Sequence, residues 1–183
     1  MYPKEGIMTA QDMKRREEVV RSYFRLLSKI MEGDEKAVDE MLELWDEDGS
    51  IQFLGPPPLE AEFRGRAAVA VWLSNRLKVR GMPVKIKGIG GEAADSLSLT
   101  TINLIEIRAV GEKIIAPHET TVGTDKEQGF ILPGHNVFTF KGDKIFSVKV
   151  ILSPKPEVAE GLKLEELSVL DVGRLSLAAW AVV

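Results

Sequence analysis

Cysteine is absent from the 183 residues of this sequence, and histidine occurs only twice, as His118 and His135. The lack of cysteine excludes disulfides, thiolate nucleophiles and cysteine-ligated metal centres. Two isolated histidines do not supply the three or four ligands that a protein metal site normally needs. We therefore expect no metal and no other cofactor.

Long apolar runs and an excess of positive charge are also lacking. The longest apolar tract, Leu175 to Val183, is interrupted by Ser176 and is shorter than the roughly 20 residues that cross a bilayer. The first six residues lack the apolar core of a signal peptide. A net charge of -4 argues against nucleic acid, because phosphate binding normally requires a basic surface. We expect a cytoplasmic protein that has neither a membrane nor a nucleic acid as its partner.

The composition is ordinary for a globular protein, with 44% hydrophobic and 28% charged residues. The length suits one domain, which we place at residues 1–154. Residues 155–183 would form a C-terminal extension that is apolar between Leu162 and Val183. We expect this extension to pack on the domain or on a partner subunit.

Three helices are predicted in the first half of the chain. Thr9 and Asp12 form a capping-box pattern, and apolar residues then recur every three or four positions as far as Met31. A second helix would place Trp45 on its apolar stripe, and the acidic residues 46–48 would form its polar exit rather than a calcium loop. A third helix is expected from about Arg66 to Arg80.

Alternating patterns predict strands in the rest of the chain, so the expected fold class is α+β, with the helices on one face of a mostly antiparallel sheet. The expected strands are Ser50–Leu54, Ala61–Arg64, Val84–Ile89, Ser98–Ala109, Lys113–Thr124, Phe130–Phe140 and Lys144–Leu152. The inward-facing positions predicted from the alternation include Asn103, Ile114, Ala116, His118, Thr120, Asn136, Phe138, Phe140, Phe146, Val148, Val150 and Leu152.

Four segments in this order resemble one family. They are Val19–Phe24, Leu42–Gly49, Phe63–Ala68 and the hairpin Gly134–Ile145. Together they resemble the nuclear transport factor 2-like superfamily, also called SnoaL-like, over about residues 10–153. The resemblance implies a cone-shaped, cystatin-like curved sheet wrapped by three N-terminal helices, with a pocket at the wide end. It also implies a homodimer through the outer sheet face, and either enzymes (isomerases, dehydratases, cyclases, epoxide hydrolases) or binding proteins.

Ketosteroid isomerase is one enzyme that this resemblance allows us to test. Its mechanism needs a carboxylate base and an oxyanion hole made of a tyrosine and a neutral acid. Tyr23 matches the tyrosine, and Asn136 stands where the acid would be. The base falls at Phe53, which cannot accept a proton.

Limonene epoxide hydrolase is the second enzyme to test. The resemblance implies an arginine between two aspartates, at the positions of His118, Thr120 and Val150. Neither carboxylate is present. The sequence therefore argues against epoxide hydrolysis by that mechanism and leaves the question of an enzyme open, with binding favoured.

Each candidate residue has more than one interpretation. His118 is the one acid–base candidate expected inside, and its neighbour Glu119 should point away, so a structural, a ligand-bonding or a catalytic role remains open. Tyr23 either packs in the core or reaches a pocket. Asn103 and Asn136 need hydrogen-bond partners if they are buried, from the protein or from a ligand. The aromatic residues that either fill the core or line a pocket are Trp45, Phe53 and Trp72.

Three functions follow as hypotheses. The first is a homodimer that binds a small, largely apolar molecule. The second is an isomerase, dehydratase or cyclase in which His118 transfers protons, while Tyr23 and Asn136 donate hydrogen bonds to an oxyanion. The third is an assembly module that uses residues 162–183. The residues expected to orient a ligand are Tyr23, Asn103, His118, Thr120 and Asn136.

Overall fold

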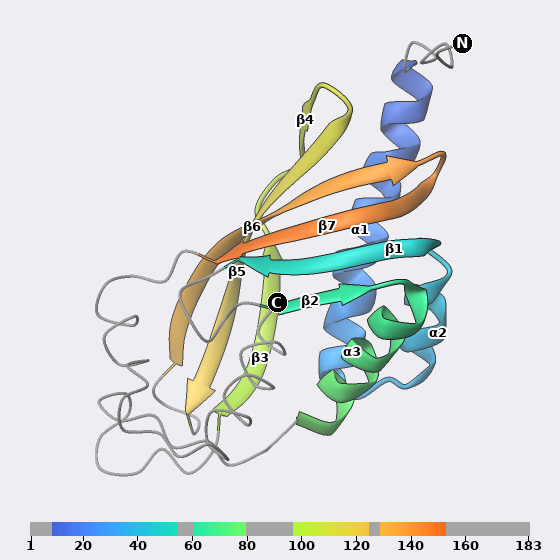
Figure 1. The fold of residues 1–183 in the computed structure, drawn as a ribbon. Helices are drawn as coiled ribbons and strands as arrows, with labels where there is room; N and C mark the ends of the chain where they lie inside the picture. Colours follow the sequence, from blue (N-terminus) through green and yellow to red (C-terminus); the bar gives the residue numbers. More distant parts are fainter. Residues whose placement is uncertain (1–8, 55–60, 80–96, 125–128, 153–183) are drawn as a thin grey trace.

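The computed structural model describes residues 9–54, 61–79, 97–124 and 129–152, and has an α+β architecture (Figure 1). Three helices lie within these residues: α1 (Ala10–Glu32), α2 (Lys36–Leu42) and α3 (Arg66–Val79). The strands are β1 (Trp45–Leu54), β2 (Ala61–Arg64), β3 (Leu97–Leu104), β4 (Arg108–Val110), β5 (Lys113–Thr124), β6 (Gly129–Lys141) and β7 (Lys144–Leu152).

The strands form one open, curved sheet in the order β2-β1-β7-β6-β5-β3, and β4 pairs with β5 beside β3. Every pair is antiparallel except β1 with β7, which is parallel. The predicted mostly antiparallel sheet is thus confirmed. In Figure 1 the long helix α1 crosses behind β1 and β7. Buried residues of all three helices and of the inner sheet face join in a single apolar core.

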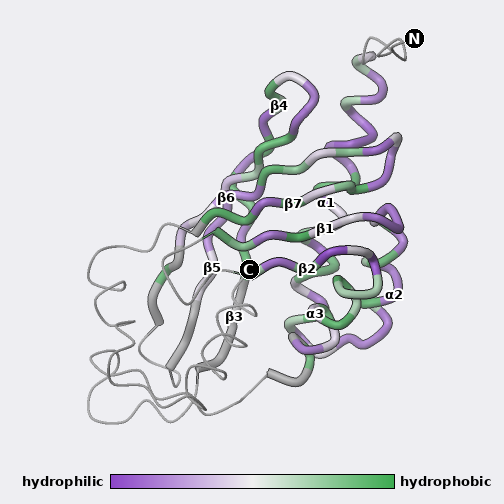
Figure 2. The backbone as a smooth tube through the Cα atoms, in the orientation of Figure 1, coloured by the Kyte–Doolittle hydropathy of each residue, from purple (hydrophilic) through white to green (hydrophobic). Residues whose placement is uncertain are grey.

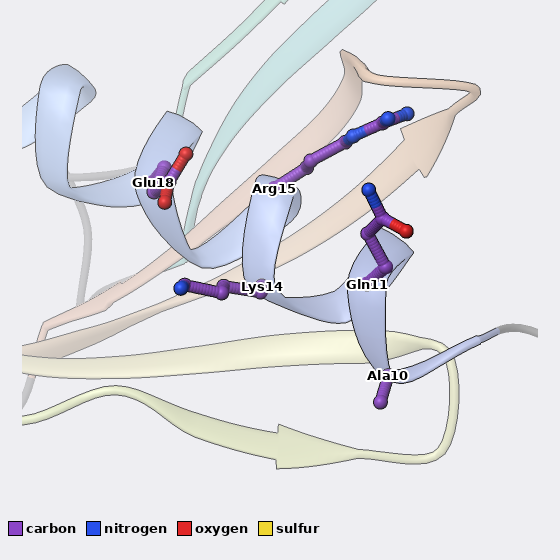
Figure 3. A pocket seen from close by; sticks show the side chains of 5 residues that line it. All are labelled: Ala10, Gln11, Lys14, Arg15 and Glu18. Carbon is purple, nitrogen blue, oxygen red and sulfur yellow. The ribbon is translucent and has the colours of Figure 1, made fainter.

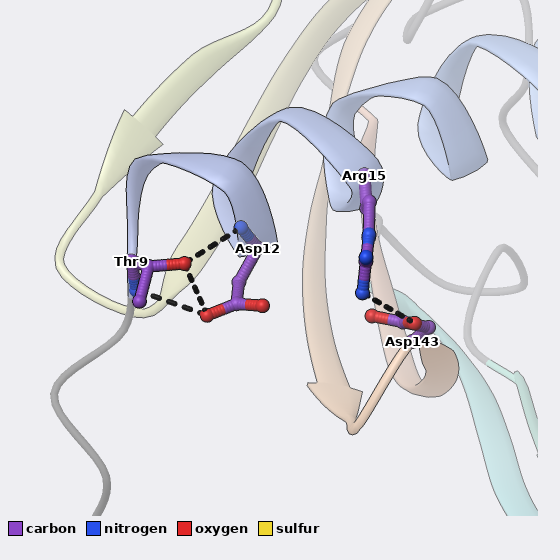
Figure 4. Close-up of polar contacts among 4 residues, drawn as sticks. All are labelled: Thr9, Asp12, Arg15 and Asp143. Carbon is purple, nitrogen blue, oxygen red and sulfur yellow. Dashed lines mark hydrogen bonds and ion pairs between the residues drawn. The ribbon is translucent and has the colours of Figure 1, made fainter.

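Helix α1 is held in place at its first turns. Thr9 and Asp12 form the predicted capping box, in which the Asp12 backbone N–H donates to Thr9 Oγ1 over 3.1 Å and the Thr9 N–H donates to Asp12 Oδ2 over 3.0 Å (Figure 4). Arg15 then pairs with Asp143 over 3.8 Å, across the turn between β6 and β7. The guanidinium of Arg16 lies 5.3 Å from the centre of the Phe140 ring. The two arginines thus link the first turns of α1 to the β6–β7 hairpin.

The predicted end of the second helix is wrong. Helix α2 stops at Leu42, and Trp45 begins β1, where it pairs with Ile145. Trp45 is still buried, at 1% exposure. The acidic residues after it lie in an irregular part of the strand, because the register shifts between Trp45 and Ser50. Gly49 permits this shift, since a Cβ there would lie 2.9 Å from the Asp46 carbonyl oxygen.

The prediction of one strand over residues 98–109 is also wrong in detail. The segment divides into β3 and β4, and Asn103 is exposed rather than inward. Asn103 pairs with Glu119, whereas the preceding Ile102 pairs with the buried Thr120. A register shift between residues 99 and 101 causes the difference, because one extra residue moves every later side chain to the other face.

Phe146 was expected inside and is 42% exposed instead. The cause is a second register shift, since Thr139 pairs with Ser147 but Phe140 pairs with Ile145. Ile145 therefore occupies the inner position, with no exposed surface. After this shift the predicted alternation of β7 is confirmed, with its two central valines buried.

Figure 2 shows hydrophilic residues over the turn that joins β6 to β7. Lys141 at this turn pairs with Asp46 of β1 over 3.2 Å.

No described helix is both long and apolar enough to cross a membrane. The expected strand at 84–89 and the extension at 155–183 lie outside the described residues.

Candidate functional site

Three polar side chains are buried within the described part of the chain, and all three come from β5 and β6. They are His118 and Thr120 on β5 and Asn136 on β6, each with no exposed surface. All three were predicted inward, and the structure places them on the sheet face that the helices cover. The rest of the described inner face is apolar. A polar group in such surroundings loses its water, so its partners determine its role.

The strand register places two of these side chains next to each other. Asn136 is directly opposite Ala116, and His118 is directly opposite Gly134. Asn136 and His118 are therefore diagonal neighbours, and such pairs have Cα atoms about 7–8 Å apart. The other two residues of this group of four, Ala116 and Gly134, have only a methyl group and a hydrogen atom as side chains. We call these four residues the polar block.

Gly134 is a member of the polar block that the sequence analysis missed. A Cβ on Gly134 would lie 3.2 Å from both Cε1 and Nε2 of His118, and 2.8 Å from the backbone oxygen of Ile151. The imidazole ring therefore lies over the glycine, in space that any larger residue would occupy. A glycine inside a predicted strand often marks such a close approach, so the position of Gly134 within the predicted strand is the sequence signal for it.

His118 is placed by its backbone and by α1. Its Nδ1 lies 3.5 Å from the carbonyl oxygen of Ala116, and the ring centre of Phe24 is 5.6 Å away. Because a carbonyl oxygen only accepts, this contact favours the tautomer with its proton on Nδ1. Nε2 lies beside Gly134. None of the described aspartates and glutamates is buried, so none of them lies with His118 in the core.

Asn136 is the least satisfied of the three polar side chains. Neither its Oδ1 nor its Nδ2 has a hydrogen-bond partner among the described residues, and the hydroxyl of Thr120 lacks one as well. Each buried group left without a partner costs roughly 1–3 kcal/mol of stability. The buried indole N–H of Trp45 is in the same state. Native structures rarely keep such groups without a partner, which is usually protein, water or a ligand.

The predicted aromatic residues line the same side of the sheet in two groups. Tyr23 of α1 packs edge-on against Phe138 at 5.2 Å and lies 6.4 Å from Trp45, by ring centres. Phe53 of β1 lies 5.6 Å from Trp72 of α3. Phe53 is also in register with Asn136 through one intervening strand, which puts the two about 10 Å apart.

The structure thus brings seven of the eight predicted ligand-orienting or pocket residues to one side of the sheet, and Asn103 is the exception. The seven do not form one cluster. His118 and Asn136 lie together, with Thr120 further along β5, while Tyr23 and Trp45 lie over the apolar part of the inner face. Within the described chain, no three histidine, aspartate or glutamate residues gather to hold a metal ion.

A separate hollow of about 580 Å³ lies on the outer surface beside the first turns of α1 (Figure 3). Its lining contains none of the predicted site residues and no buried polar group. Charged side chains dominate its lining, which includes Lys14, Arg15 and Glu18. We therefore place the candidate site at the polar block and not in this hollow.

Comparisons with known proteins support the architecture. No protein-family model matches the sequence, and no curated protein sequence matches it. Among solved structures, a Catenulispora acidiphila protein with a ketosteroid isomerase-like fold has a TM-score of 0.56 and 13% identity, over 82% of this chain and 98% of that one. An LEH-like epoxide hydrolase from M. tuberculosis has a TM-score of 0.54 and 12% identity, over 81% and 90%.

A third similar structure is a nuclear transport factor 2-like protein of unknown function from Cytophaga hutchinsonii. Its TM-score is 0.50 at 11% identity, over 81% of this chain and 100% of that one. All three similarities span most of both chains, and at these identities they establish the fold and not an activity. The chain therefore has the nuclear transport factor 2-like fold.

Proposed function

We propose that this protein binds a small, largely apolar molecule on the inner face of the sheet, at the polar block. The observation that carries the proposal is the amide of Asn136, which is fully buried and has no partner for either polar atom among the described residues. A ligand with polar atoms would supply those partners. The apolar surroundings would bind the remainder of the molecule through the hydrophobic effect.

Asn136 is the first polar residue that a ligand could contact, and Thr120, further along β5, is the second; we call these two residues the polar anchors. Thr120 is four residues from Ala116, the register partner of Asn136, which corresponds to about 14 Å along the strand. His118 lies between them on the same face. A ligand that reached both anchors would therefore pass over the imidazole. Phe24, which packs against that imidazole, would form part of its cover.

The similar structures are compatible with this proposal. The Catenulispora acidiphila protein was crystallised in complex with trimethylamine, so a protein of this fold holds a small organic molecule. The same fold also occurs in an epoxide hydrolase. Because one fold carries several functions, the proposal rests on the polar block and not on those activities.

An isomerase, dehydratase or cyclase is the second candidate. It is favoured by the burial of Tyr23, His118 and Asn136 on the same side of the sheet. His118 would transfer the proton, because no described carboxylate is buried with it. Incubation of an extracted ligand with the wild type and with His118→Gln tests this. A product formed only by the wild type supports turnover, and an unchanged ligand supports binding alone.

Native mass spectrometry of the purified full-length protein tests the proposed binding. We expect a mass increment from a stoichiometric small molecule, which denaturation releases for identification. Asn136→Leu should lower its occupancy, because Leu has the same branching but makes no hydrogen bond. Asn103→Leu is the matched control on the opposite face, and it should retain the ligand. A bare-chain mass in every preparation, with no molecule recovered, would contradict the proposal.

A further inference from the structure

We infer that the molecule bound at the polar block is neutral and presents a hydrogen-bond acceptor next to a donor, as a carboxamide, a lactam or a protonated carboxylic acid does. This inference rests on the proposed function and specifies the chemistry of its ligand. The pairing atoms on the protein side are Oδ1 and Nδ2 of Asn136, both fully buried and both without a partner among the described residues.

The two amide atoms of Asn136 determine which chemical groups of a ligand can pair with them. Nδ2 only donates and Oδ1 only accepts, and the two lie side by side in one plane. A ketone, ester or ether would pair with Nδ2 and leave Oδ1 buried without a donor. A group that offers both an acceptor and a donor satisfies the two atoms together. This requirement is the same whichever way the amide is turned, because a flip exchanges the two atoms without changing the pair.

The charge of the ligand follows from the residues around it. The buried polar residues of the described chain are Asn136, His118 and Thr120, and none of them carries a fixed charge. The nearest neighbours of Asn136 across the strands are Ala116 and Val150, which are both fully buried. A carboxylate or an ammonium group placed there would lose its water without meeting an opposite charge. A neutral amide-like group avoids that penalty.

The residues that flank Asn136 in the polar block are small. Ala116 faces Asn136 across the strands with a single methyl group, and Gly134 precedes Asn136 on the same face of β6 with none. The His118 ring lies over Gly134. The planar group of a ligand would therefore lie against Asn136 above Ala116, with the imidazole beside it.

Three matched probes separate these chemistries: 2-naphthamide, 2-acetylnaphthalene and 2-naphthoate. They share one apolar ring system and differ in carrying an acceptor with a donor, an acceptor alone, or a negative charge. Isothermal titration calorimetry with the full-length protein, after removal of any bound molecule, should show that 2-naphthamide binds at least tenfold more tightly than the other two. Asn136→Leu should reduce its advantage over 2-acetylnaphthalene to less than twofold, and Asn103→Leu should preserve it.

Other outcomes would overturn the inference. Equal affinities for 2-naphthamide and 2-acetylnaphthalene would rule out paired recognition, while the binding itself would still support the proposed function. Tightest binding of 2-naphthoate, with an affinity that does not rise as the pH falls, would rule out a neutral ligand. An advantage for the amide that survives in Asn136→Leu would place its partner elsewhere. If none of the probes binds, the inferred chemistry fails, and the native mass measurement still decides the proposed function independently.

Discussion

Two neighbouring levels of the inner sheet face, each a row of residues paired across the strands, differ in whether their polar groups have hydrogen-bond partners. The first level runs across β1, β7, β6 and β5 through Ile51, Val148, Phe138 and Ile114, and we call it the apolar row. All four of its residues are fully buried, and the rings of Tyr23 and Phe24 cover it from α1. The apolar row has no polar group that needs a partner.

The polar block begins one level further along the same strands. There Asn136 takes the place that a hydrophobic residue has in the apolar row, and two of its own polar atoms remain without a partner in the described structure. Packing alone would favour an apolar side chain at this position. The comparison indicates that the first level serves stability, whereas the second gives up stability at the place where we propose that a ligand binds.

Loss of an aromatic ring from the apolar row should give the largest effect. Phe138→Ala removes a fully buried ring whose centre lies 5.2 Å from the ring centre of Tyr23 and 6.3 Å from that of Phe24. We expect the free energy of unfolding to fall by about 3–5 kcal/mol, from lost burial and the cavity that remains. Urea unfolding followed by far-UV circular dichroism measures this. A loss below about 1 kcal/mol would show that the apolar row is not the stabilising level.

A methyl group at Gly134 should disturb the polar block directly. In Gly134→Ala the new Cβ would lie 2.8 Å from the Ile151 carbonyl oxygen and 3.2 Å from the His118 ring, so both the β7 backbone and the ring must shift. We expect a destabilisation of about 1–3 kcal/mol, typical of overpacking. A changed chemical shift of the His118 ring protons in NMR spectra would locate the strain. Unchanged stability and unchanged His118 signals would contradict the close approach.

Asn136→Leu should act in the opposite direction to these two changes. In the ligand-free protein it replaces two buried polar atoms without partners by methyl groups, so we expect the free energy of unfolding to rise by about 1–2 kcal/mol. The control Asn103→Leu, on the exposed face, should stay within about 0.5 kcal/mol of the wild type. Thermal and urea unfolding measure both. A clear destabilisation by Asn136→Leu would mean that its amide is structural.

The smallest effect concerns acid stability at the start of α1, away from both levels. Hydrogen bonds from Thr9 hold the pKa of Asp12 below its ordinary value of 3.8. A lowered pKa in the folded state means that this contribution to stability is present above the ordinary pKa and is lost as the pH falls through the folded value. Thr9→Ala should therefore flatten the fall in stability below about pH 4. Parallel curves for both proteins would contradict this.

The alternation of side chains was enough to predict much of the inner face. It placed His118, Thr120 and Asn136 inside, because β5 and the second half of β6 are regular strands there. The capping box at Thr9 followed from a local pattern that needs no tertiary contact. The four-segment resemblance led to the fold that the solved structures support.

Irregular pairing explains what the sequence could not reveal. The shifts in β3 and in the β6–β7 pair reversed the expected faces of Asn103 and Phe146, and a bulge has no reliable sequence signal. Trp45 follows the apolar residues of α2 at a helical spacing, so its place in β1 was hidden. The role of Gly134 depends on its register with His118, which a single sequence does not contain.

A high-resolution crystal structure of the full-length protein, purified without added ligands, tests the central claim most directly. The decisive feature is the electron density around the side-chain amide of Asn136. Our account predicts density for a molecule that is not part of the chain, with an acceptor and a donor within about 3.2 Å of Nδ2 and Oδ1. A side chain of the protein itself, or ordered water alone, paired with both atoms would contradict it.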